Sequence, residues 1–242
     1  MIELRNVNKS FGSQQVLSGL DMYVERGTSF AIMGPSGTGK SVLLKHIIGL
    51  LVPDSGTVNV DGRSVPDLNM IELQELRREM GYLFQFGALI NWLDIFDNIA
   101  LPLRETTSMD EEQIEERVAE VLEMVHLQDT SHKLPSEISG GMQKRVGLAR
   151  ALVTRPSIIL YDEPEAGLDP GMSIAISELI RRLQNEHGMT SLIVTHSSEC
   201  ASIAADQLAI FDGGKFVAQG KPADILNSDH PRVRSFLGQR RT

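Results

Sequence analysis

Residues 30–41 read Phe-Ala-Ile-Met-Gly-Pro-Ser-Gly-Thr-Gly-Lys-Ser and carry the clearest structural signal in the chain. Four apolar residues predict a buried strand, the next residues match the pattern G-x-x-x-x-G-K-[ST], and an apolar helical pattern continues over residues 40–49. A glycine-rich loop between a strand and a helix lets backbone N–H groups surround phosphate oxygens, and the helix N-terminus adds positive potential. The stretch therefore predicts a nucleotide-phosphate site.

This loop also supplies candidate ligands. We expect Lys40 to reach the β- and γ-phosphates and the Ser41 hydroxyl to bind Mg²⁺. A chance glycine turn is the alternative, but the strand before the loop and the helix after it favour phosphate binding. Kinases, GTPases, helicases and transporters all share the pattern, so it does not identify the family. The candidate nucleotide-binding residues of this region are Gly34, Pro35, Ser36, Gly37, Thr38, Gly39, Lys40, Ser41 and Val42.

A second predicted strand ends in acids. Residues 158–163 read Ile-Ile-Leu-Tyr-Asp-Glu, so the carboxylates of Asp162 and Glu163 follow a buried strand. Beside a phosphate loop, Asp162 can hold Mg²⁺ and Glu163 can orient or deprotonate the attacking water. The alternative is a strand that ends in surface acids. Glu165 adds a third acid for which the pattern predicts no role, and the Tyr161 hydroxyl needs a partner if it is buried.

Strand and helix patterns alternate along most of the chain. In the middle, Ser108 and Glu111 fit a capping box, and apolar residues from Ile114 to Val125 recur on one helical face. The alternation predicts an α/β sheet domain with a helical insertion at about residues 86–152 and a short helical tail. The expected strands are residues 2–7, 16–24, 30–33, 81–84, 157–161, 191–195 and 207–211, with a hairpin turn at Asp61-Gly62, and the expected further helices are residues 40–49, 142–153, 171–187 and 199–204.

Composition narrows the function classes. The 242 residues are 41% hydrophobic, which suits one large domain or two small fused ones with a sizeable core. The net charge of −9, from 23 Lys and Arg against 32 Asp and Glu, disfavours a protein that grips nucleic acid by bulk charge. The single cysteine, Cys200, excludes an internal disulfide and a cysteine cluster for zinc. The chain contains no run of 18 apolar residues and no signal-peptide pattern, so we expect no membrane span.

Ser139-Gly140-Gly141 stands 23 residues before Asp162 and opens a helical pattern. This tripeptide resembles the signature of ATP-binding-cassette (ABC) ATPases, although Met142 replaces the glutamine that usually follows. Further family motifs appear in the same order, and the resemblance covers residues 2 to about 238. The matching positions are Phe11 and Val16 at the adenine, Gln85 in the Q-loop, Gly167-Leu168-Asp169 in the D-loop and His196 at the switch histidine.

Three of these positions have structural alternatives. Phe11 is otherwise a core aromatic residue, Gln85 a polar strand cap and His196 a structural histidine. Their places within the family pattern favour the functional interpretation of each.

The resemblance implies an α/β fold. The core would be a P-loop NTPase (RecA-like) domain, with an N-terminal antiparallel β subdomain and a helical subdomain inserted between the Q-loop and the signature motif. A single ABC ATPase domain would span residues 2–238, with the helical subdomain at about residues 86–152 and a tail at residues 239–242.

ATP hydrolysis, with ATP and Mg²⁺ as cofactors, is the activity that the resemblance implies. The family forms homodimers with composite sites, in which the signature of one protomer closes on the ATP that the other holds. The implied catalytic residues are Glu163 and His196, the implied metal-site residues are Ser41, Gln85 and Asp162, and the implied nucleotide contacts include Phe11, Val16, Ser139, Gly140, Gly141 and Asp169.

Two further segments indicate a subfamily. Residues 86–105 and 230–237 resemble the ATPase subunits of Mla and Mce-associated systems, which move phospholipid or other lipid between bacterial membranes. This implies permease subunits and an Mce-domain lipid-binding protein as partners, no nucleic acid, and a peripheral location on the cytoplasmic side of the bacterial inner membrane. We expect residues 86–103, with Trp92, to form much of the groove that receives a permease helix. An ordinary helical-subdomain surface is the alternative.

Two other functions stay open at this point. One is the ATPase subunit of an ABC importer for a polar solute. The other is a soluble ABC protein of translation or DNA repair, but such proteins usually carry two cassettes or a long coiled-coil insertion. Neither feature occurs in this sequence.

Overall fold

The structure is a computed structural model that describes residues 1–238; the expected tail, residues 239–242, lies outside the described residues. A six-stranded sheet forms its centre, and five strands from β9 to β6 pair in parallel while β10 runs antiparallel to β9. The strand order is β10 (Lys215–Gly220), β9 (Gln207–Asp212), β3 (Ser29–Met33), β8 (Thr190–Thr195), β7 (Ile158–Asp162) and β6 (Met80–Leu83).

A smaller antiparallel sheet comes from the N-terminal part of the chain. Asp61 and Gly62 both have positive φ and form the expected hairpin turn in this sheet. The two sheets confirm the predicted α/β core and the predicted N-terminal antiparallel part. The order of the small sheet is β2 (Gln14–Val24), β1 (Ile2–Phe11), β4 (Ser55–Val60) and β5 (Arg63–Ser64).

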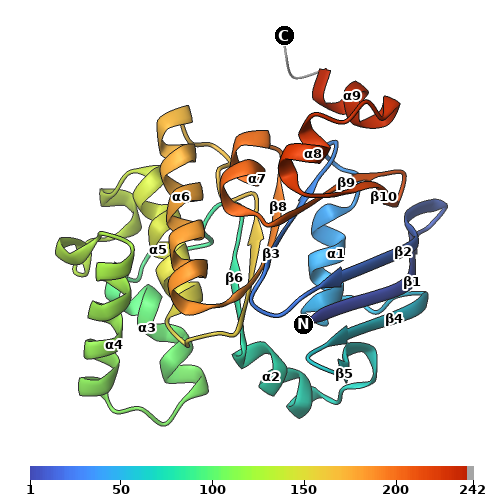
Figure 1. Cartoon of the computed structure of the whole chain (residues 1–242). Coiled ribbons are helices and arrows are strands. Elements are labelled where there is room, and N and C mark those ends of the chain that lie inside the picture. The colour runs from blue at the N-terminus through green and yellow to red at the C-terminus, as the bar shows by residue number, and fades with distance from the viewer. Residues whose placement is uncertain (239–242) are drawn as a thin grey trace.

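Helices cover both faces of the central sheet (Figure 1). The helix α1 (Lys40–Ile47) shares an apolar core with the antiparallel sheet, whereas α5 (Gly140–Leu152), α6 (Pro170–His187) and α7 (Ser198–Ala204) belong to the core on the opposite face. No helix within residues 1–238 has both the length and the apolar character needed to cross a membrane. The other helices are α2 (Met70–Arg78), α3 (Ile95–Thr106), α4 (Glu111–Met124), α8 (Pro222–Leu226) and α9 (Pro231–Gly238), and short 3₁₀ segments occupy Val65–Asp67, Gln128–Thr130 and Pro135–Glu137.

Side chains of β3 alternate between these two cores. Phe30 and Ile32 face the core shared with α1, while Ala31 and Met33 face the core beneath α5 and α6. All five residues of the strand are buried. Because both faces are covered, the strand needs apolar residues at every position, which explains the continuous apolar run in the sequence.

The helical insertion has the predicted apolar face but a different start. The helix α4 begins behind Asp110, whose Oδ1 accepts a hydrogen bond from Gln113 N at 2.9 Å, while Gln113 Oε1 accepts one from Asp110 N at 3.1 Å. The predicted capping box of Ser108 and Glu111 is therefore wrong. Thr107 still belongs to the end of α3, with its hydroxyl bonded to Leu103 O, so Ser108 lies in the connection between the helices. The buried face of α4 and its C-cap includes Ile114, Val118, Val121, Leu122 and Val125.

Sequence patterns missed α2 and β10, and they predicted no range for β4 and β5, the two strands on either side of the expected hairpin turn. In α2 Leu76 is buried and the other residues are exposed or half-buried. This helix therefore has little of the apolar periodicity that marks the other helices. Its start is nevertheless a capping box formed by Asn69 and Glu72, a signal that could have found it.

A buried asparagine holds the segment that precedes α3. Asn98 is 0% exposed, and its Oδ1 accepts a hydrogen bond from Ile90 N at 2.7 Å. Its Nδ2 lies 3.0 Å from the carbonyl oxygens of Ile90 and Leu93 and 2.8 Å from that of Asp94. This segment contains Trp92, which is 83% exposed. Asn98 therefore fixes the backbone that presents Trp92 to solvent.

Replacing Asn98 should destabilise the protein. Asn98→Ala leaves buried backbone groups without their partner, and we expect it to lower the free energy of unfolding by about 2–4 kcal/mol. Urea denaturation measures the loss. Asn185→Ala, on the exposed side of α6, is the matched control and should change stability little. Equal stability of the two variants would show that the segment does not depend on Asn98.

Candidate functional site

The phosphate loop connects β3 to α1, and its glycines are required by close packing. A Cβ at Gly34 would lie 2.2 Å from Phe211 O, and a Cβ at Gly39 would lie 2.2 Å from Val16 Cγ1. Gly39 also has φ 112°, a conformation that favours glycine. The structure thus places Val16 against the phosphate loop, as a residue that packs on its backbone.

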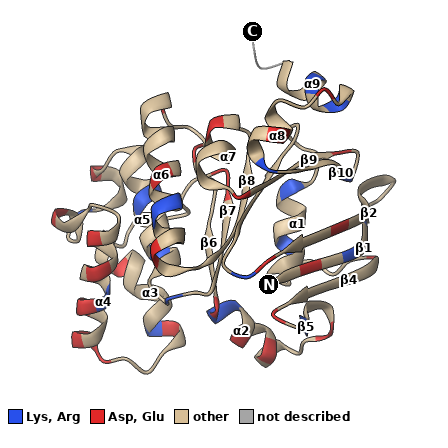
Figure 2. Ribbon diagram, viewed as in Figure 1, with Lys and Arg blue, Asp and Glu red and all other residues tan. Residues whose placement is uncertain are grey.

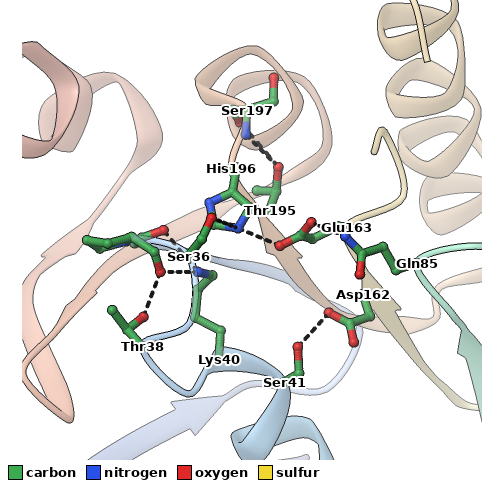
Figure 3. A network of polar contacts seen from close by, with 12 residues as sticks. Ser36, Thr38, Lys40, Ser41, Gln85, Asp162, Glu163, Thr195, His196 and Ser197 are labelled. Carbon is green, nitrogen blue, oxygen red and sulfur yellow. Dashed lines mark hydrogen bonds and ion pairs between the residues drawn. The ribbon is translucent and has the colours of Figure 1, made fainter. Parts of the chain in front are cut away.

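Lys40 lies across the inside of the loop (Figure 3). Its Nζ donates to Gly34 O at 2.9 Å and to Pro35 O at 2.7 Å. The Thr38 hydroxyl donates to the same Pro35 oxygen at 2.8 Å. These bonds hold the ammonium group beside the N-terminus of α1. The charge of Lys40 and the dipole of the helix therefore both make the potential at the loop more positive.

Ser41 and Asp162 face each other across the gap between α1 and β7. The Ser41 hydroxyl donates to Asp162 Oδ1 at 3.0 Å, and the Tyr82 hydroxyl donates to Asp162 Oδ2 at 3.2 Å. Burial, followed by the Asp162 charge, raises the pKa of Tyr82 well above its usual value, so its hydroxyl stays a donor. Hydroxyl and carboxylate oxygens are the ligands that Mg²⁺ prefers, and this ion normally completes its shell with phosphate and water. The residues present therefore fit Mg²⁺.

Glu163 lies between two polar side chains at the end of β7. Its Oε1 is 2.5 Å from His196 Nε2, and its Oε2 accepts a hydrogen bond from Gln85 Nε2 at 2.7 Å (Figure 3). Because the amide nitrogen of Gln85 is directed to Glu163, its amide oxygen is left as a further candidate ligand for the metal. His196 Nε2 also lies 3.4 Å from the Ser36 hydroxyl. The loops after four strands, β3, β6, β7 and β8, therefore meet around one point.

A buried lysine, missed by sequence reasoning, links this cluster to α5. Lys144 Nζ donates to Gln85 O, and it lies 3.3 Å from Glu163 O. Burial lowers the pKa of Lys144, and the neighbouring charge of Glu165 opposes that shift. Further along α5, Arg150 donates to the carbonyl oxygens of Gly87 and Ala88. Because α5 carries three basic residues, Lys144, Arg145 and Arg150, their spacing alone did not single out the buried one.

The remaining predicted residues are not gathered at this point. Phe11 ends β1, is 46% exposed, and has the Lys9 ammonium 5.7 Å from its ring centroid. The Ser139 hydroxyl accepts a hydrogen bond from Met142 N at 3.3 Å and so caps α5. Asp169 caps α6 in the same way, through Met172 N at 3.0 Å. The hydrogen bonds that the side chains of Ser139 and Asp169 accept thus come from their own helices.

Relatives of this chain are ATP-binding proteins of transport systems. Residues 17–166 match the family described as ABC transporter. The probable ribonucleotide transport ATP-binding protein mkl of Mycobacterium leprae is 43% identical over 240 residues, which are 99% of this chain and 69% of the relative. The intermembrane phospholipid transport system ATP-binding protein MlaF of Haemophilus influenzae is 40% identical over 237 residues, 98% of this chain and 90% of the relative. The methionine import ATP-binding protein MetN of Clostridium tetani is 37% identical over 239 residues, 99% of this chain and 75% of the relative.

A solved structure agrees with these relatives. It is the dimeric structure of a post-hydrolysis state of an ATP-binding cassette bound to ADP and Pi, with a TM-score of 0.84 and 34% identity over 92% of this chain and 99% of that chain. The fold, the family match and the relatives all lead to one assignment: this chain belongs to the ABC transporter family, as an ATP-hydrolysing subunit.

Proposed function

We propose that Glu163 orients and deprotonates the water that attacks the γ-phosphate of ATP. The observation that carries this proposal is the position of Glu163, whose two carboxylate oxygens are held by Gln85 and His196. A carboxylate fixed in this way is already oriented for proton transfer and does not have to reorient before it accepts a proton from the water. His196 would contact the γ-phosphate, since its Nε2 also lies near Ser36 in the phosphate loop.

The phosphate loop would bind the nucleotide, and Mg²⁺ would be held beside the phosphates. Lys40 and the backbone N–H groups of the loop would bind the phosphates, with Val42 following in α1 and the Phe11 ring stacking on adenine. Ser41, Asp162 and Gln85 would hold Mg²⁺, which supplies positive charge to the β- and γ-phosphates when bound.

A second protomer would complete each site. Ser139 and Gly140 are exposed at the N-terminus of α5, a position that can accept a phosphate group from another molecule. We place Ser139, Gly140, Gly141 and Asp169 of one protomer against the ATP of the other. The dimeric cassette of similar fold supports this arrangement.

The transported substrate is the finer part of the proposal. We propose that this ATPase drives the movement of phospholipid or another lipid between bacterial membranes, together with a permease and an Mce-domain protein, from the cytoplasmic side of the inner membrane. Its 40% identity to the phospholipid-transport relative and the resemblance of residues 86–105 support this. Import of a polar solute is the second candidate, favoured by the 37% identity to the methionine importer's subunit.

The permease would dock on residues 86–103. Phe86 and Trp92 are 78% and 83% exposed, far more than apolar side chains that pack a helical core. Three other apolar residues of the segment belong to the interior: Ile95 is buried, and Leu89 and Phe96 pack against the core. We propose that Phe86 and Trp92 are the part of this segment that a permease helix covers.

Glu163→Gln should keep ATP binding and lose turnover. The change preserves size and removes the proton acceptor, so we expect the steady-state ATPase rate to fall by roughly 10²–10⁴ while calorimetry shows ATP affinity near the parent value. Glu186→Gln, at an exposed position of α6, is the matched control. Hydrolysis within about threefold of the parent enzyme would rule out this role for Glu163.

Trp92→Ala should weaken co-purification with the membrane subunit and leave the melting temperature unchanged. Truncation of an interface hot spot costs about 2 kcal/mol or more, which is about 30-fold in affinity. Tyr23→Ala, another exposed aromatic residue at 51% exposure on β2, is the matched control. An undiminished pull-down of the Trp92 variant would reject the docking surface.

Phospholipid should co-purify with the assembled transporter. The complex of this subunit with its permease is purified in detergent, and its lipid extract is compared with that of an unrelated membrane protein prepared in the same way. We expect enriched phospholipid, and ATPase activity in liposomes that does not respond to free methionine. Methionine-stimulated hydrolysis without retained phospholipid would favour the importer.

A further inference from the structure

Glu165 has no place in the proposed reaction, yet it lies against the segment that carries His196. We propose that Glu165 is a positioning residue, which fixes the backbone of His196 and thereby sets the contact between His196 and Glu163. This inference rests on the proposed roles of His196 and Glu163, and the experiment below separates the two.

One carboxylate oxygen of Glu165 collects three donors from the end of β8. Its Oε1 accepts hydrogen bonds from His196 N at 3.2 Å and from Ser197 N at 3.3 Å. The Thr195 hydroxyl donates to the same oxygen. Consecutive donors on residues 195–197 thus converge on a single atom, and hydrogen bonds to a charged acceptor are stronger than those between neutral groups.

Glu165 and Glu163 belong to the same folded turn. Glu163 N donates to Val194 O at 2.8 Å, Ala166 N to Glu163 O at 3.0 Å and Leu168 N to Glu165 O at 3.1 Å. The turn therefore contacts the end of β8 in two ways. Glu163 reaches the imidazole of His196 (Figure 3). Glu165 holds the backbone from which that imidazole extends. The turn that contains Glu163 and Glu165 and the end of β8 thus together set the distance between His196 and Glu163.

Two ionisable side chains lie near Glu165, whose second carboxylate oxygen, Oε2, is buried without a hydrogen-bond partner among residues 1–238. Burial, and then the Glu165 charge, raises the pKa of the Cys200 thiol to about 12, so this neighbour stays neutral. The ammonium group of Lys144 is close enough for the Glu165 charge to act on its pKa. The charge of Glu165 is therefore partly balanced by Lys144 and by the backbone N–H groups of His196 and Ser197.

Two substitutions of Glu165 separate the effect of its hydrogen bonds from the effect of the space that its side chain fills. Glu165→Gln keeps an oxygen that can accept from His196 N and Ser197 N, whereas Glu165→Ala removes it. We expect Glu165→Ala to lower kcat by about 10- to 100-fold, because small displacements of a reacting group have effects of this size. The KM for ATP should stay within about twofold, and Glu165→Gln should recover most of the rate.

A double-mutant cycle in the full-length protein tests the route through His196. In a His196→Ala background, Glu165→Ala should cost less than about threefold in kcat, because the side chain that it positions is gone. Glu199→Ala is the matched control: an exposed acid at the start of α7, close in sequence to the same segment. Thermal melts of all variants accompany the kinetics.

Each outcome decides something different. Equal losses in the two backgrounds, a rise in KM at unchanged kcat, or full activity of Glu165→Ala would each overturn the positioning role. If Glu165→Ala does not fold, Glu165→Leu, which fills the space without an acceptor, replaces it in the same cycle, and an equal loss in both backgrounds again overturns the positioning role. If His196→Ala alone leaves kcat unchanged, the proposed function of His196 fails, and the positioning proposal fails with it. A slow His196→Ala beside an unaffected Glu165→Ala would remove the positioning role alone.

Discussion

Parallel pairing of β3, β8, β7 and β6 is the constraint on which the whole site depends. Met33 pairs with Thr195, and Asp162 pairs with Val194, so the C-terminal ends of these strands reach the same edge of the sheet. Open parallel sheets bind ligands outside this edge. The phosphate loop, the acids and the histidine arrive from distant parts of the chain because backbone hydrogen bonds align the strands that end in them.

Three acids in four residues have different environments, and the backbone separates them. Asp162 ends β7 and faces Ser41 and Tyr82 on the α1 side. Glu163 has φ 50°, an uncommon conformation for a residue with a side chain, and its carboxylate turns instead to Gln85 and His196. Glu165 then lies under the end of β8. Neighbouring residues can thus take separate parts in one site because the turn after a strand changes direction at each of them.

The helix α5 joins the helical part of the molecule to this edge. Lys144 and Arg150 bind carbonyl groups of the Q-loop, and between them Gly147 is so close that a Cβ there would lie 3.1 Å from Gly87 Cα. The same helix begins at Ser139. The Q-loop backbone and the signature are therefore attached to one rigid element, which also touches the Glu163 turn through Lys144. Figure 2 shows acidic residues repeated along α4, a helix that packs against α5.

Local periodicity and residue spacing in the amino-acid sequence predicted the sheet domain, the phosphate loop and the order of the motifs. The sequence also identified Lys40, Ser41, Asp162, Glu163, Gln85 and His196 as site candidates, and the structure brings these six together. The contacts of Glu165 and Lys144 depend on how the folded chain packs, since their partners lie in other elements. Asn98 instead bonds to carbonyl groups of the loop just before its own helix. A backbone carbonyl or N–H group is the same at every residue, so no pattern of side chains reveals which one a buried charge will meet; that choice is made when strands, turns and helices pack.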